Sequence, residues 1–100
     1  MTDELRVIIV PVYGAPYEAV IPNELKDFQQ LVGGYIQTFS YGEYLLVENE
    51  EGELKGLPWN PHIMDTYDTY CGQVVITKTR GEWFVPLNDM DVKRIMEMLV

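Results

Sequence analysis

The hydrophobic pattern of the first 21 residues predicts a β-hairpin. Leu5–Val12 is a mostly apolar run rich in β-branched side chains, which is typical of a central strand covered on both faces. A turn signal with Gly14 and Pro16 follows, and Tyr17–Ile21 is short and apolar enough to return as a second strand. We therefore expect the chain to begin with two paired strands.

Helical spacing appears directly after this hairpin. Pro22 fixes the entry, and Asn23 is predicted to cap the helix by accepting a backbone N–H. The predicted apolar face contains Leu25, Phe28, Leu31 and Val32. Gly33-Gly34 is expected to end the helix, because glycine adopts the left-handed conformation without a steric cost.

The middle of the chain predicts another strand pair, Tyr35–Phe39 with Tyr44–Glu48, joined at Tyr41-Gly42. Asn49–Gly52 predicts a further turn, and Glu53–Lys55 a brief extension of strand. The segment His62–Tyr70 fits neither period, so a short helical turn and coil both remain open.

The last third predicts a hairpin and a helix. In the strand Gly72–Thr79, Val74 and Ile76 share one face and Val75 lies on the other, and Glu82–Pro86 is expected to return as its partner. Asn88 is expected to cap the final helix, with Asp91 completing a capping box. The apolar stripe of this helix contains Val92, Ile95, Met96 and Leu99.

These elements predict one α+β domain over residues 1–100, with a mainly antiparallel sheet built from hairpins and two helices. No apolar run approaches the ~20 residues that cross a bilayer. The start, Met1-Thr2-Asp3-Glu4, is acidic rather than basic and apolar, so no secretory signal is expected and the predicted location is the cytoplasm.

The net charge of −9 argues against binding to a nucleic-acid backbone, which requires Lys and Arg. Acidic residues instead serve solubility or imitate DNA for a protein that binds it. Their main concentration is at the turn, where Glu48, Glu50, Glu51 and Glu53 lie close together in sequence. We interpret Glu50, Glu51 and Glu53 as charges on a solvated turn rather than as a site for a hard cation.

Catalytic chemistry has few candidate residues. The chain has one Cys and one His, and Cys71 is interpreted as a buried, inert thiol beside a strand. His62 with Asp65 and Asp68 can form a metal-binding or acid–base cluster, but a structural histidine is the favoured interpretation. We therefore expect no enzyme activity, catalytic residue, metal or cofactor.

The run Asn49–Pro61 predicts a binding loop. It is too rich in Gly and Pro for a helix or strand, and loops of this kind in small domains usually have a function. Lys55 brings positive charge beside Gly56, where a ligand can approach the backbone. Trp59 can stack on a planar ring, unless it plugs the core with Leu57. The predicted ligand-binding residues are Asn49, Lys55, Gly56, Trp59 and Asn60.

This loop and the Gly33-Gly34 region carry a family resemblance. Leu31–Ile36, followed by Asn49–Asn60, resembles the DUF3846 family, and Gly72–Ile76 and Leu87–Asp91 match later positions of its pattern. That family comprises small proteins of bacteria, phages and mobile elements and has no known function. The resemblance implies a phage or mobile-element setting and supplies no catalytic residues. Trp59 occupies a position that the family pattern does not fix.

Two functions follow as expectations. One is a non-enzymatic protein that acts against host defence by sequestering a nucleotide signal. In this function Lys55 would bind the phosphate, an aromatic ring would stack on the base, and backbone amides of the loop would donate hydrogen bonds. A homo-oligomer can complete such a pocket. The alternative is an acidic inhibitor or DNA mimic that binds a host protein.

Overall fold

The computed structural model describes residues 3–64 and 69–100, and its centre is a six-stranded sheet. Five strands run in the order β2-β1-β5-β4-β3, and the sixth, β6, pairs with β5. Every one of these pairs is antiparallel. The strands are β1 (Glu4–Val10), β2 (Tyr17–Pro22), β3 (Ile36–Tyr41), β4 (Tyr44–Asn49), β5 (Val74–Arg80) and β6 (Trp83–Val85). The predicted α+β class with an antiparallel sheet is confirmed.

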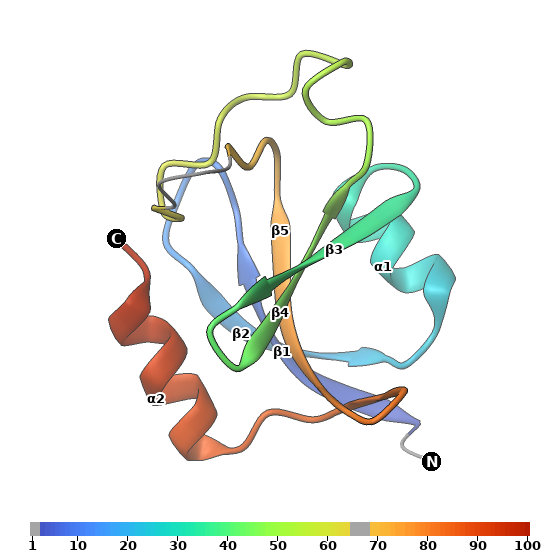
Figure 1. Ribbon diagram of the computed structural model, residues 1–100, viewed down its shortest axis with the longest axis vertical. Helices are drawn as coiled ribbons and strands as arrows, with labels where there is room; N and C mark the ends of the chain where they lie inside the picture. Colours follow the sequence, from blue (N-terminus) through green and yellow to red (C-terminus); the bar gives the residue numbers. More distant parts are fainter. Residues whose placement is uncertain (1–2, 65–68) are drawn as a thin grey trace.

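Two helices lie on opposite sides of this sheet (Figure 1). Helix α1 (Leu25–Val32) packs Phe28 and Val32 against side chains such as Val75. Helix α2 (Asp89–Met98) packs Ile95 against the other face, where Ile76 lies. The central strands are therefore covered twice, which explains why β1 and β5 are apolar at consecutive positions.

Helix α1 corrects the predicted cap. Its N-cap is Glu24, and no side chain caps it. The backbone N–H of Asn23 instead donates to the carbonyl of Asp3 at 2.9 Å, because β2 runs one residue further than predicted. Leu25 was also predicted to face the core, but it begins the helix and is 58% exposed. The predicted end is confirmed, since Gly33 has a φ of 83° and its N–H bonds the carbonyl of Gln29.

Helix α2 confirms its capping box. The side chain of Asn88 accepts from the Asp91 N–H at 2.8 Å, and the carboxylate of Asp91 accepts from the Asn88 N–H at 2.9 Å. Ile95 is fully buried, with Val92 and Leu99 packed beside the same core. Met96 was predicted to join them, but it is exposed because it lies one position past the buried stripe.

The remaining elements differ from prediction mainly at their ends. Strand β1 stops at Val10, before Pro11, and β6 covers only the middle of the predicted Glu82–Pro86 strand. The predicted extension over Glu53–Lys55 is wrong, because these residues continue a series of turns. Part of the ambiguous segment His62–Tyr70, residues 65–68, lies outside the described residues. Neither described helix combines the length and the apolar character that crossing a bilayer requires.

Candidate functional site

The predicted binding loop is an ordered chain of turns. Within it, the N–H of Lys55 donates to the carbonyl of Glu51 at 2.8 Å, and Leu57 N–H to that of Gly52 at 2.9 Å. Its second half lies along residues 70–72, where Gly72 N–H donates to Pro58 at 2.7 Å. Trp59 forms an isolated antiparallel bridge with Cys71. The loop is therefore held against the start of β5 by backbone bonds.

Asn60 lies inside the protein. Its side chain is 0% exposed, and its amide nitrogen donates to the carbonyls of Val10 and Gly72, each at 3.0 Å. Its amide oxygen accepts from the His62 N–H at 3.1 Å. Both amide hydrogens and the oxygen are thus used to fix the loop against β1. The predicted contact of Asn60 with a ligand therefore lacks an exposed surface on this residue.

Asn49 is buried in a similar way. Its amide nitrogen donates to the carbonyl of Val32 at 3.2 Å, and its oxygen accepts from the Glu51 N–H at 2.8 Å. The first bond joins the loop to the end of α1, and the second shapes the turn. Asn49 also lines a cavity described below, so one wall of that cavity is held by the side chain itself.

Lys55 and Gly56 are exposed, as a binding role requires. The Lys55 ammonium lies over Gly34: a Cβ atom placed there would be 3.1 Å from Nζ and 2.9 Å from the amide nitrogen of Asn49. Gly34 is therefore required by close packing, although the sequence indicated only a helix stop. Within the described part of the chain, no carboxylate lies within ion-pair distance of Lys55.

Trp59 does not plug the core. Its side chain is 62% exposed, so that alternative is wrong for Trp59. Leu57 is half-buried and packs over Gly72, where an added Cβ would come within 2.9 Å of a Leu57 methyl. The indole of Trp59 therefore points outward, whereas Leu57 packs against Gly72, just before β5. The exposed ring is available to contact a partner.

An apolar groove of about 410 Å³ lies on the α1 side of the loop. Leu57 and Pro58 line one side, and Tyr13, from the turn after β1, lies on another. Gln30 and Gly33 contribute the end of α1. Lys55 does not line this groove, but its ammonium lies close to Gly34, which directly follows the groove residue Gly33. No signal in the sequence indicates this groove, because its residues come from four separate segments.

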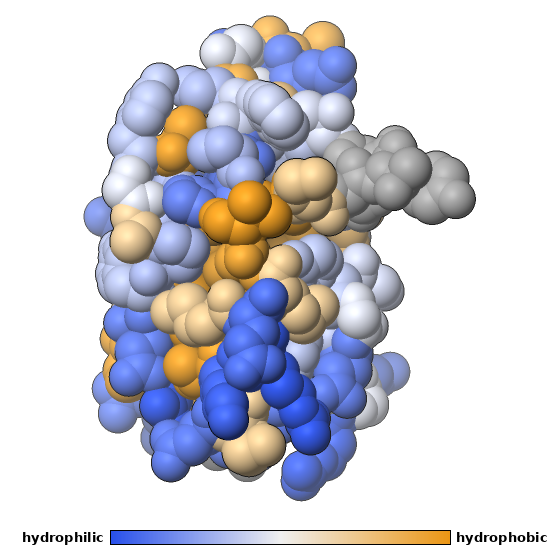
Figure 2. Space-filling model, turned by 90° about the vertical axis from the view of Figure 1, so that its left-hand side faces the viewer, coloured by the Kyte–Doolittle hydropathy of each residue, from blue (hydrophilic) through white to orange (hydrophobic). Residues whose placement is uncertain are grey.

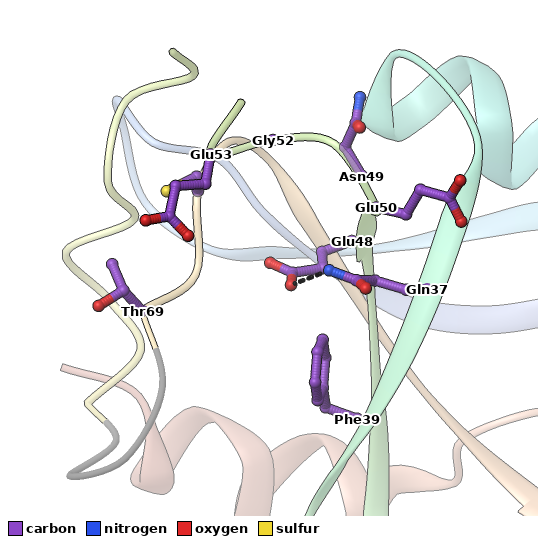
Figure 3. Close-up of a pocket in the computed structure, with 9 residues that line it drawn as sticks. Gln37, Phe39, Glu48, Asn49, Glu50, Gly52, Glu53 and Thr69 are labelled. Atoms are coloured by element: carbon purple, nitrogen blue, oxygen red, sulfur yellow. Dashed lines mark hydrogen bonds between the residues drawn. The ribbon is translucent and has the colours of Figure 1, made fainter. Parts of the chain in front are cut away.

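An acidic cavity of about 350 Å³ lies at the base of the same loop, between the ends of β3 and β4 and the segment before β5 (Figure 3). The carboxylates of Glu48 and Glu53 point toward a common space, whereas Glu50 points away from it. Gln37 donates to the Glu48 carboxylate at 2.9 Å. The cavity therefore favours cationic groups.

Cys71 also lines this cavity and is half-buried rather than buried. Burial raises the pKa of its thiol, and the carboxylates of Glu53 and Glu48 raise it further. The thiol is therefore protonated at neutral pH and a poor nucleophile. In the described ranges, no group of three or more His, Cys, Asp or Glu side chains is arranged to hold a metal ion.

His62 is engaged through both ring nitrogens. Nδ1 lies 2.8 Å from the backbone oxygen of Val100, and Nε2 lies 2.8 Å from that of Gly14. The other members of the acid–base cluster considered above, Asp65 and Asp68, lie outside the described residues. The favoured interpretation of His62 as a structural residue is consistent with these two contacts.

Comparison with known proteins identifies a family. The model of the family described as "Domain of unknown function (DUF3846)" matches residues 5–100, and the chain therefore belongs to this family. No curated protein and no solved structure matches it. The resemblance seen in the sequence is confirmed, and it extends over nearly the whole chain.

Proposed function

We propose that this DUF3846 protein is a non-enzymatic binding protein of a phage or mobile element, which acts against host defence in the host cytoplasm by sequestering a nucleotide signal. The observation that carries this proposal is an apolar groove that ends at Gly33, next to Gly34, where the Lys55 ammonium lies close by. We take this ammonium as the rim of the binding site. A nucleotide combines an apolar, planar base with an anionic phosphate. The groove and its rim offer a complementary surface to each part.

The groove side of the site takes the base. Tyr13 is 82% exposed, so its ring is accessible for stacking, and base–aromatic stacking contributes ~1–3 kcal/mol per base. Leu57 and Pro58 also line the groove and would pack against the base. The exposed Gln30 amide offers both a donor and an acceptor to a base edge.

The rim of the site takes the phosphate. Lys55 has no ion-pair partner among the described residues, so binding a phosphate does not require an existing salt bridge to break. A net charge of −9 opposes an anionic ligand, and a local ammonium offsets this at short range. A homo-oligomer would enclose the open groove with a second subunit.

Isothermal titration calorimetry against a panel of cyclic and linear nucleotides tests this proposal. We expect at least one nucleotide to bind at micromolar protein, and Lys55→Met to weaken that binding at least tenfold, since a charge-assisted hydrogen bond is lost. Lys93→Met is the matched control, because Lys93 is an exposed lysine on α2. No heat with any nucleotide, or equal losses in both variants, would contradict the proposal.

The acidic cavity favours a second candidate, an acidic inhibitor or DNA mimic that binds a host protein. A cavity of about 350 Å³ with Glu48 and Glu53 pointing inward fits a Lys or Arg side chain of a partner. Pull-down from host lysate should then recover one stoichiometric protein. We expect Glu53→Lys to abolish capture and Glu82→Lys, on an exposed turn, to retain it. Unchanged capture with Glu53→Lys would count against this surface.

A further inference from the structure

The contacts of His62 join three segments that are distant in sequence. Through Nδ1 it contacts the backbone oxygen of Val100, 38 residues away, and through Nε2 that of Gly14, 48 residues away, each at 2.8 Å. The His62 backbone carbonyl also accepts from the Val100 N–H at 2.9 Å. The turn after β1, the end of the binding loop and the segment after α2 therefore meet at one imidazole.

Both partners of the ring are backbone oxygens, which accept hydrogen bonds and do not donate them at neutral pH. A neutral imidazole has one N–H, so it can donate to only one of the two. The geometry points to an imidazolium at His62 that donates to Gly14 and Val100 together. We propose that this imidazolium is a proton-dependent clasp, and that loss of one proton releases one of the two segments.

His62 is suited to such a role because histidine ordinarily changes charge between pH 5 and 8. It is the one histidine of the chain. The described titratable side chains within three residues of its two partners are Tyr13, Tyr17 and Glu97. Side chains of these types ordinarily titrate outside that pH window. Asp65, three residues after His62, lies outside the described residues.

The clasp is placed to position the groove of the proposed function. Gly14 follows Tyr13 on one side of the groove, and His62 follows the Leu57–Pro61 segment on the other. Gly14 has a φ of 96°, and an added Cβ would meet nothing within 4 Å, so neighbouring atoms do not pack against this point of the turn. The bond from His62 therefore restrains the Tyr13 side of the groove. His62 is a positioning residue, and this part of the inference rests on the proposed function.

The third segment lies on the face shown in Figure 2, where hydrophobic atoms gather in the middle and hydrophilic atoms lie below them. Three exposed hydrophobic side chains are close in sequence to His62 or are part of the C-terminal segment: Met64, Met96 and Val100. Figure 1 shows the C-terminus beside the turn that follows β1. Release of Val100 would therefore change this surface as well as the groove.

Nuclear magnetic resonance of the protein, with its imidazole nitrogens labelled, tests the clasp without any ligand. At pH 5.5 we expect both ring nitrogens to carry a hydrogen-bonded proton. As pH rises to 8, the backbone amide signals of Ala15 and Val100 should shift over the same pH range as the imidazole nitrogen signals of His62. In His62→Gln, these two amide signals should no longer shift over that range. A single neutral tautomer throughout, or a ring titration that leaves both amide signals unchanged, would overturn the proposal.

Binding tests the consequence for the groove. With a nucleotide found as described above, we expect wild-type affinity to fall about tenfold from pH 5.5 to pH 8, the effect of one charge-assisted hydrogen bond. His62→Gln should show a flat profile, while Lys55→Met should weaken binding at both pH values. A wild-type profile as flat as that of His62→Gln would overturn the positioning role. If no nucleotide binds, the proposed function fails, while the resonance experiment still decides the clasp.

Discussion

The two helices cover opposite faces of one sheet, but they are held in different ways. Helix α1 has no side-chain cap and is fixed by apolar packing, with the Phe28 ring 5.2 Å from that of Phe84. Helix α2 has a capping box and a buried carboxylate, Asp91, at its first turn. A small domain can therefore hold one helix by apolar packing and the other by a specific network of polar contacts.

The polar network works because Asp91 has several partners. Its carboxylate accepts from the Asn88 N–H, from the Tyr44 hydroxyl at 2.9 Å and from the Lys78 ammonium. Burial raises the pKa of Asp91, but these three donors together outweigh that effect and hold the pKa below its ordinary value. A buried charge is tolerated here because its hydrogen-bonding capacity is filled.

The largest loss of stability is expected from the apolar packing of α1. Phe28→Ala should lower the free energy of unfolding by about 3–5 kcal/mol, since it removes a fully buried ring and leaves a cavity. Urea unfolding followed by circular dichroism measures this. Leu25→Ala, at an exposed position of the same helix, is the control and should change stability little. A small effect of Phe28→Ala would mean that α1 is not held by packing.

The second-largest loss of stability is expected from the polar network at the start of α2. Asp91→Ala is expected to cost about 3 kcal/mol at pH 7, because it leaves Lys78 and Tyr44 without their shared acceptor. Asp89→Ala is the matched control, since Asp89 is in the same turn and exposed. Equal losses in the two variants would show that a first-turn charge, and not the network, stabilises α2.

The pH dependence of this network has a definite sign. Because the folded pKa of Asp91 is lowered, its stabilisation is complete above the unfolded pKa of ~4 and is lost as pH falls through the folded value. Wild-type protein should therefore lose its advantage over Asp91→Ala on acidification. Urea midpoints of both proteins at pH 7 and pH 2.5 measure the difference, and a constant gap would contradict this assignment.

A smaller effect is expected where α1 meets the binding loop. Gly34→Ala would place a methyl group 2.9 Å from the buried amide of Asn49, which cannot move without losing its bond to Val32. We expect a loss of about 1–2 kcal/mol in urea unfolding and a displaced Lys55. Gly56→Ala is the comparison, because its added methyl group has open space and meets only the strain of a φ of 70°. The Lys55 resonances should shift in the first variant.

The smallest stability effect is expected at the edge of the polar network. Tyr44→Phe should cost about 1 kcal/mol, since it removes the hydroxyl bond to Asp91 and keeps the ring. Burial, and then the bond to Asp91, raise the pKa of Tyr44 to about 12. Ultraviolet titration of wild-type protein should show a late-ionising phenol that this variant lacks. Its persistence in Tyr44→Phe would assign the late step to another tyrosine.

Much of the fold could be predicted because its signals are local. The capping box of α2 needs only Asn88 and Asp91, and the buried faces of β5 follow from alternation at Val74, Val75 and Ile76. The cap of α1 could not be predicted in the same way. The pairing of β1 with β2 extends to Pro22 and draws the Asn23 N–H to Asp3, so tertiary pairing overrides a local preference.

The loop that carries the proposed site could be recognised in the sequence, but the burial and the partners of its side chains could not. A Gly- and Pro-rich run with a lysine is visible along the chain, and Lys55 and Gly56 are indeed exposed. The burial of Asn60 depends on Val10, which is 50 residues away. The acidic cavity likewise requires the register that places Gln37 opposite Glu48. Such non-local contacts leave no periodic signal in a single sequence.

The central position of β5 has a consequence for how the protein folds. Strand β5 pairs with β1, β4 and β6, and it comes after both earlier hairpins in the chain. Until β5 is synthesised, the β1–β2 and β3–β4 hairpins have no strand to join them, and isolated hairpins are marginally stable in water. Joining of the two hairpins through β5 should therefore be a late, cooperative step during translation. This step depends on contacts between residues that are far apart in sequence.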